Sequence, residues 1–274
     1  MILKIKNYFL ISSLIFALGS CGDSKQENLD EAEIPEVKLD SQKISAQNIF
    51  NALPARSKVT SLATATKAEY NFNILNDPNN VNKYTIESSK ALNLGVYGSD
   101  LNTAGLFEQT QESMMFLKCV NILAKSLGVS NAFDEKMVNR MEANKENRDS
   151  TMTIISQSFR NTDNYLKQNG RPGTSALIVA GVWIEGMYIA CNTAKETKSE
   201  AIVKEIFSQS ESLKYLIELL IASKVDTGSN YIISDLKGIQ ELYHLKTDAV
   251  YTLDALKELD SKITKLRSAV ILSK

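Results

Sequence analysis

The chain has 274 residues, with 31 Lys and Arg against 32 Asp and Glu, one His, three Cys, four Pro and one Trp. Apolar residues make up 43% and charged residues 23%. This composition is that of an ordinary globular protein, and it excludes a collagenous, disulfide-dense or polytopic membrane protein. The near-neutral charge gives no sign of a nucleic-acid-binding surface, so we expect no nucleic-acid partner.

The first 20 residues carry the pattern of a secretory signal peptide. Lys4 and Lys6 precede an apolar run over residues 8–18, and small residues follow it. The run has eleven residues, whereas a helix that spans a membrane needs about 20. We therefore expect residues 1–20 to be cleaved.

The run ends in Leu18-Gly19-Ser20-Cys21, which resembles the lipobox of bacterial lipoproteins. In that class the Cys thiol is diacylated and the freed amine is then acylated, so the resemblance implies that Cys21 is the first mature residue and the lipidation site. Two or three acyl chains hold a protein stably on a membrane, since each buried methylene contributes about 0.8 kcal/mol. The membrane is thus the expected partner through Cys21. The alternative is an uncleaved anchor helix with a chance cysteine.

The residues after Cys21 bear on the localisation of the protein and on its domain boundaries. Gly22 stands where enterobacterial lipoproteins of the inner membrane have Asp, so the resemblance favours the outer membrane, with the domain facing the periplasm or exposed at the surface. Residues 22–43 hold seven acidic residues, three Lys and no aromatic residue, which is typical of disordered segments. We therefore expect a lipidated Cys and acidic tether over 21–44 and one helical domain over 45–274.

The remainder of the chain has helical periodicity and no strand pattern. Caps and apolar spacing predict helices over residues 46–53, 57–69, 83–93, 96–127, 131–146, 149–168, 173–194, 199–223 and 231–272, the last with a bend or break near Gly238 or residues 246–247. The expected fold class is all-α, a single multi-helix bundle with a central apolar helix at about 173–194 and a long C-terminal helix.

Local signals fix several of these helix ends. Gly128 and Gly170 are the expected stops, because glycine readily adopts the left-handed conformation after a helix. Pro172 suits the first turn of the next helix. Asp149 is the expected cap of the helix over 149–168.

The segment 176–191 is apolar around its whole circumference, so other helices must surround it. A membrane span is the rival interpretation, but the segment is short and Glu185 interrupts it. A buried carboxylate must be paired, hydrogen-bonded or neutral. We expect a structural hydrogen bond or ion pair of Glu185 with an Arg such as Arg148 or Arg160, or with Tyr97 or Tyr165. The alternatives are a ligand or metal contact and acid–base catalysis.

Asp100 is a second carboxylate among small and apolar residues. Gly95, Gly98 and Gly105 surround it, and three glycines in a helical segment indicate close helix crossings or a local break beside a pocket. Trp183 is the expected core anchor of the central helix, with ligand stacking as the alternative.

The segment around Asp100 is similar to a signature of uncharacterised all-helical lipoproteins from Bacteroidetes. The similarity lies in Lys83-Tyr84 and in residues 90–101, KALNLGVYGSDL, and residues 133–135, 165–171 and 182–185 fit the same family. It covers roughly residues 49–194 and implies a helical envelope protein without assigned catalytic residues. The chain departs from the family after Pro54, where Arg56 stands in place of an acid.

Signatures of most familiar enzymes are missing. The sequence has no Cys-x-x-Cys, His-Glu-x-x-His, P-loop or Gly-x-Ser-x-Gly motif. The single histidine, His244, cannot make a His-rich metal site. We expect no catalytic residue, no metal and no cofactor, while a carboxylate-only site with Asp100, Glu185 or Asp163 stays open.

Two cysteines, Cys119 and Cys191, remain after lipidation, in a compartment that permits disulfides. Both lie in apolar helical stretches. Two separate buried thiols are favoured over a bridge, because a bridge needs Cα atoms within about 7 Å.

Three functions are compatible with these patterns. The leading one is a non-enzymatic, lipid-anchored domain that binds a protein partner in the cell envelope or acts as a scaffold. The alternative is a small-molecule-binding lipoprotein with a pocket near Tyr97, Asp100, Trp183 and Glu185. The third is a hydrolase or lyase that uses those carboxylates.

Overall fold

The structure is a computed structural model that describes residues 62–63, 65–130, 133, 135–144, 147–244 and 252–273. All of them belong to one unit, Asp40–Lys274. The predicted signal peptide, the tether and the helix over 46–53 lie outside the described residues, as do residues 57–61 and 64 of the helix predicted over 57–69.

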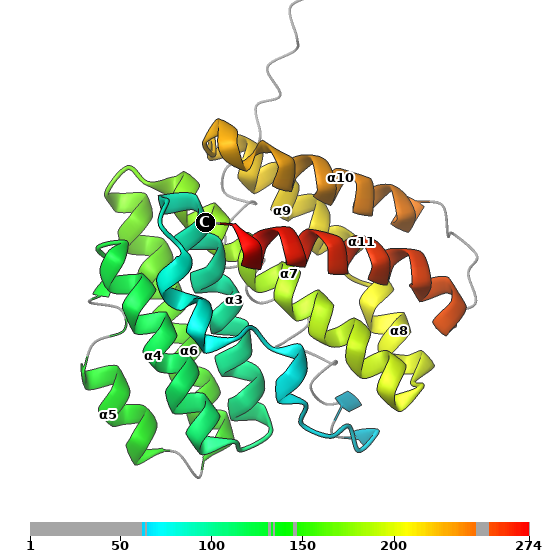
Figure 1. Ribbon diagram of the computed structural model, residues 1–274, viewed down its shortest axis with the longest axis horizontal. Helices are drawn as coiled ribbons and strands as arrows, with labels where there is room; N and C mark the ends of the chain where they lie inside the picture. Colours follow the sequence, from blue (N-terminus) through cyan, green and yellow to red (C-terminus); the bar gives the residue numbers. More distant parts are fainter. Residues whose placement is uncertain are drawn as a thin grey trace, which may run out of the picture. The chain divides into compact units, whose positions relative to one another are not determined.

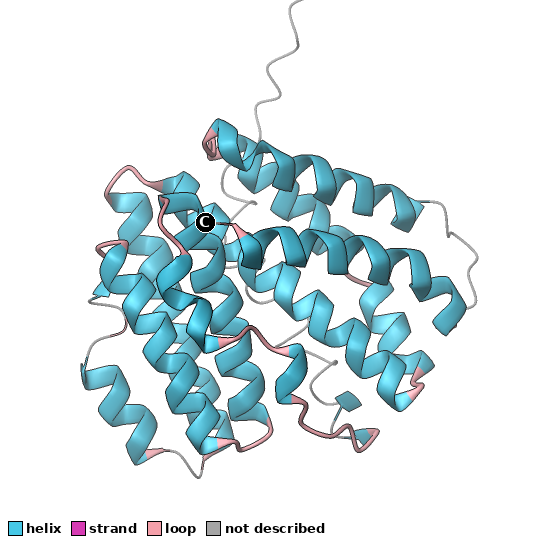
Figure 2. Cartoon of the chain, viewed as in Figure 1, coloured by secondary structure: helices cyan, strands magenta, loops and turns pink. Residues whose placement is uncertain are grey.

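The described residues form nine α-helices and no strand, joined mostly by short loops (Figure 1, Figure 2). The helices are α3 Glu87–Leu106, α4 Thr110–Ser126, α5 Glu135–Ala143, α6 Arg148–Gln168, α7 Pro172–Thr197, α8 Glu200–Phe207, α9 Ser210–Ala222, α10 Asn230–His244 and α11 Leu253–Leu272. Short 3-10 turns cover Phe72–Ile74, Pro78–Lys83 and Thr227–Ser229. The predicted all-α bundle is confirmed.

Helix α7 is the centre of the bundle. It packs against α3, α6, α8, α9 and α11, and Figure 1 shows α11 running alongside it. Among the described residues it is the one helix long and apolar enough to cross a membrane, and 89% of its apolar window is buried inside the protein. Other helices therefore cover α7 on all sides, as its apolar residues around the whole circumference predicted.

Helices α3 and α7 cross at a pair of glycines. A Cβ atom on Gly95 would lie 2.1 Å from the carbonyl oxygen of Ile178, and one on Gly181 would lie 1.9 Å from that of Leu92. Only glycine lets the two backbones approach so closely. Helix α3 is therefore continuous through residues 94–95, where the sequence predicted a break between two helices. The close crossing with α7 compensates for the low helix propensity of glycine.

The local stop and start signals gave several boundaries correctly. Gly128 and Gly170 have φ of 73° and 69°, just after α4 and α6, and Pro172 lies in the first turn of α7. The cap of α6 was predicted two residues too late. It is Asn147, whose side chain accepts a hydrogen bond from the Ser150 backbone N–H at 2.9 Å, and not Asp149.

Three long helices of the sequence prediction are each divided in the structure: the one over 96–127 between α3 and α4, the one over 199–223 between α8 and α9, and the one over 231–272, in which a bend or break was expected, between α10 and α11. The helix predicted over 199–223 is interrupted between α8 and α9, where the Ser208 hydroxyl donates to the Glu205 carbonyl at 2.7 Å and so satisfies the end of α8. The helix predicted over 231–272 is α10 and α11. Gly238 lies inside α10, and Thr252 caps α11 through the Ala255 backbone N–H.

Candidate functional site

The four side chains that the sequence grouped into a ligand site come from α3 and α7. Tyr97, Asp100, Trp183 and Glu185 all have 0% exposure, and none of them lines the surface pocket described below. The Tyr97 hydroxyl donates to the backbone carbonyl of Asp77 at 2.8 Å. A ligand reaches these four residues only if the helices separate, so ligand binding there stays a prediction.

Glu185 is held by a residue that the sequence analysis did not consider. Arg267 of α11 donates from Nε to Glu185 Oε2 at 2.9 Å and from Nη2 to Oε1 at 2.8 Å. The expected structural pairing with an Arg is therefore confirmed, but the Arg is neither of the two named as examples, Arg148 and Arg160. Such a bidentate Arg–carboxylate contact is a strong form of charge-assisted hydrogen bond.

The Arg267 guanidinium has further neighbours inside the protein. Its Nη2 also donates to the Ile74 carbonyl at 3.1 Å, and its central carbon lies 4.5 Å from the centre of the Tyr188 ring. Burial opposes the charged form of Arg267, but the Glu185 carboxylate raises its pKa. Arg267 is thus a permanent cation in the core.

Asp100 lies beside this ion pair without a cation of its own. Its Oδ2 accepts from the Asn76 backbone N–H at 3.2 Å, while its Oδ1 is buried without a hydrogen-bond partner. Burial, and then the neighbouring Glu185 carboxylate, raise the pKa of Asp100 well above its ordinary value, although Arg267 opposes the shift. When Asp100 carries a proton, its carboxyl group can donate a hydrogen bond towards Glu185. The charges of Glu185 and Arg267 then cancel, and the three side chains carry no net charge.

The cluster of Asp100, Glu185 and Arg267 is therefore a sealed structural element. It contains two neighbouring carboxyl groups, the pattern that acid–base catalysis often uses. Catalysis also requires that a proton donor or acceptor can reach the substrate. Because all three side chains are at most 8% exposed, the arrangement offers no open catalytic site.

The spacing of α11 contained a signal for Arg267. Positions 263, 267 and 270 follow a helical step of four and three, which places Arg267 on the same face as the buried residues Ile263 and Val270. A cation on an apolar stripe indicates a buried partner. Leu266, one residue before Arg267, is also buried.

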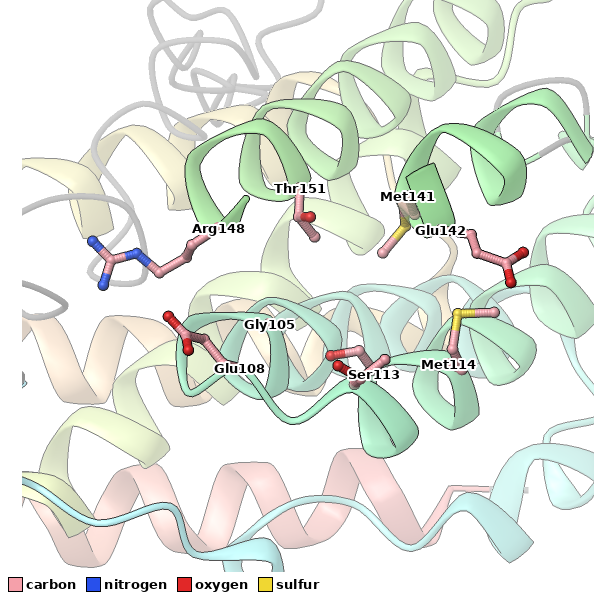
Figure 3. Close-up of a pocket in the computed structure, with 9 residues that line it drawn as sticks. Gly105, Glu108, Ser113, Met114, Met141, Glu142, Arg148 and Thr151 are labelled. Atoms are coloured by element: carbon pink, nitrogen blue, oxygen red, sulfur yellow. The ribbon is translucent and has the colours of Figure 1, made fainter. Parts of the chain in front are cut away.

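A separate pocket opens on the surface where α3, α4, α5 and α6 meet (Figure 3). Its volume is about 120 Å³. We call it the α4–α6 pocket, and it is lined by Gly105, Glu108, Thr110, Ser113, Met114, Met141, Glu142, Arg148 and Thr151. Figure 3 shows Arg148 and Glu108 at one end, Met114 and Glu142 at the other, and Ser113 and Thr151 between them.

The three glycines near Asp100 serve different purposes. Gly95 lies at the helix crossing, and a Cβ atom on Gly98 would lie 2.2 Å from the Phe159 ring. Gly105 instead lines the α4–α6 pocket. Close packing, one explanation offered by the sequence, therefore applies to Gly95 and Gly98, and the other, a neighbouring pocket, applies to Gly105.

The remaining reactive side chains do not form a site. Cys119 and Cys191 are free and buried, as favoured from the sequence, and Asp163 pairs with Lys167 at 2.9 Å and accepts from the Ser175 hydroxyl. No three His, Cys, Asp or Glu side chains within the described residues could hold a metal ion together. The side chain of His244 lies outside the described set.

Comparison of the chain with protein-family models, with curated protein sequences and with solved structures gave no match.

Proposed function

We propose that this protein is a lipid-anchored component of the bacterial cell envelope, most consistent with the outer membrane, and that its helical domain acts by binding a partner and not by catalysis. The observation that carries the proposal is the position of Cys21, directly after Leu18-Gly19-Ser20 at the end of an apolar run. Acyl chains on Cys21 would keep the domain at the membrane, where its partners would be other envelope proteins.

The enclosed acid cluster supports a binding role. Asp100 and Glu185 are the buried carboxylates that a carboxylate-based hydrolase or lyase would use, and both are fully buried. Glu185 also has its two oxygens taken by Arg267. Because these two carboxylates are committed to packing, we assign partner binding to the exposed surface of the domain.

The anchor is tested by metabolic labelling with an alkyne analogue of palmitate in a bacterium that processes lipoproteins. The full-length chain should be labelled and should sediment with the membranes. A Cys21→Ser variant should lose the label, and a Cys119→Ser variant, which removes a buried cysteine outside the lipobox, should behave like the wild type. Labelling that persists in Cys21→Ser, or a wild type that carries no label, would overturn the anchor.

The partner is tested separately by crosslinking in intact cells. The anchored wild type should give a reproducible crosslinked protein, and Cys21→Ser should lose it, since that variant no longer resides at the membrane. If the wild type is labelled by palmitate but crosslinks to nothing above the background of an unrelated lipoprotein, the anchor stands and the partner-binding role fails.

A further inference from the structure

We infer that the α4–α6 pocket binds a free amino acid with an apolar side chain. This inference goes beyond the proposed role at the membrane and does not depend on the lipid anchor. It rests on three features of the pocket: a small apolar space, groups that suit a carboxylate, and groups that suit an ammonium ion.

The apolar space exists because residue 105 is a glycine. A Cβ atom at Gly105 would have the Thr151 methyl group at 3.8 Å and the Ser113 hydroxyl at 4.0 Å as its nearest neighbours, so the position is open. Met114 and Met141 supply flexible apolar walls. The volume of about 120 Å³ is slightly smaller than the roughly 150 Å³ cavity that holds a benzene molecule in another protein, so it suits a branched or thioether side chain.

The groups that suit a carboxylate lie at the start of α4. Its N-cap residue, Gln109, makes no capping hydrogen bond, because its amide donates to the Phe107 carbonyl at 2.8 Å instead. The first N–H groups of a helix favour an anion. Arg148 also lines the pocket, and among the described residues the one acid within 4 Å of it is the exposed Asp149, at 3.8 Å.

Ser113 provides an independent sign of a ligand. The residue is only 7% exposed and lines the pocket, and its hydroxyl makes no hydrogen bond within the part of the chain that the structure describes. Its oxygen is not fully enclosed and can therefore reach a bound group in the pocket. A carboxylate or ammonium group in the pocket would satisfy it.

The ammonium ion has two acidic neighbours. Glu108 and Glu142 line the pocket and are exposed, and Figure 3 shows Glu108 at the same end as Arg148. A simple anion would be repelled by these two acids, and a simple amine would be repelled by Arg148 and by the start of α4. A zwitterion satisfies both charges, with its carboxylate towards Arg148, its ammonium towards Glu108 and its side chain towards the methionines.

The ligand class is tested by titration calorimetry on the full-length protein in mild detergent. L-leucine and L-methionine should bind. L-leucinamide has only the ammonium and N-acetyl-L-leucine only the carboxylate, so each should bind about tenfold more weakly or worse. Equal binding of N-acetyl-L-leucine or L-leucinamide, or no heat from either amino acid up to about 10 mM, would overturn the inference.

The location is tested with a variant that fills the pocket and does not disturb the fold. Gly105→Ala adds a methyl group in the open space and replaces a helical glycine by a better helix former, so the thermal midpoint should hold or rise while the affinity for L-leucine falls about tenfold. Gly186→Ala is the matched control, since its nearest neighbour would be the Ser99 hydroxyl at 3.8 Å and it lies outside the pocket. Unchanged affinity in Gly105→Ala would place the ligand elsewhere and refute the assignment.

The charge contacts are tested with Arg148→Gln. This variant should bind L-leucine more weakly than the wild type and should no longer distinguish it from L-leucinamide. Retained discrimination would contradict the role of Arg148. Cys21→Ser should bind L-leucine as the wild type does, which separates this inference from the membrane anchor.

Discussion

Replacement of Asp100 by Asn tests the buried acid cluster directly. Asp100 is fully buried, and burial followed by the Glu185 carboxylate raises its pKa well above the ordinary value. An asparagine has the shape of a protonated aspartic acid. Its amide oxygen can still accept from the Asn76 N–H, and its amide N–H can donate towards Glu185. The Asp100→Asn variant therefore imitates the folded wild type with its proton in place.

The expected magnitude follows from proton linkage. The unfolded chain releases the Asp100 proton near pH 4, whereas the folded chain keeps it to higher pH. The stability linked to this proton is fully present below the unfolded pKa and is lost as the pH rises towards the folded pKa, by about 1.4 kcal/mol for each pH unit. Asp100→Asn has no such proton. Its stability should match the wild type near pH 4 and exceed it increasingly as the pH rises.

Urea unfolding followed by circular dichroism at several values between pH 4 and pH 8 measures this difference. Asp254→Asn is the control, because Asp254 is exposed and Lys257 lowers its pKa. The sign then reverses, since any stability from Asp254 is lost as the pH falls. If Asp100→Asn is less stable than the wild type at pH 8, or if the difference does not change with pH, Asp100 is ionised in the folded protein and pairs with Arg267, and the reasoning fails.

Two further predictions concern packing. Gly95→Ala should lower the free energy of unfolding by about 3 kcal/mol, because its Cβ would lie 2.1 Å from the Ile178 carbonyl oxygen and the two helices must move apart. Urea unfolding should show little or no loss of stability in the control Gly186→Ala, whose Cβ would meet no atom closer than 3.8 Å, and a mild effect in Gly95→Ala would refute the close crossing. Cys119 and Cys191 should resist a maleimide at pH 8 until the protein is unfolded, because both are buried and burial raises the pKa of Cys119 to about 11. If mass spectrometry shows that either thiol is labelled in the folded protein, the prediction is wrong.

Helix ends that depend on one or two neighbouring residues could be predicted from the sequence. Gly128 and Gly170 end helices because glycine adopts a positive φ without strain, and Pro172 begins one because its missing N–H is not needed in the first turn. The apolar circumference of α7 likewise indicated its central place. These signals lie within a few residues of the feature that they determine.

Features that depend on distant partners could not be predicted in the same way. The glycines of α3 were consistent with a break or a crossing, and only the position of Gly181 on α7 decides between them at Gly95. Glu185 required a partner, but its partner Arg267 lies 82 residues further along the chain. The α4–α6 pocket combines side chains from four segments, and no local motif marks such a site.

The buried ions of the core are best understood through the docking of the last helix. A buried ion pair adds little net stability over an apolar pair, but a charge left without its partner costs about 3–5 kcal/mol. Arg267 of α11 meets Glu185 and the Ile74 carbonyl, and the Asn93 amide donates to the Val270 carbonyl at 3.1 Å. Any shift of α11 along α7 would break these contacts together and leave a carboxylate and a guanidinium buried apart. The cluster therefore favours one register for the C-terminal helix, because every other register separates the two buried charges.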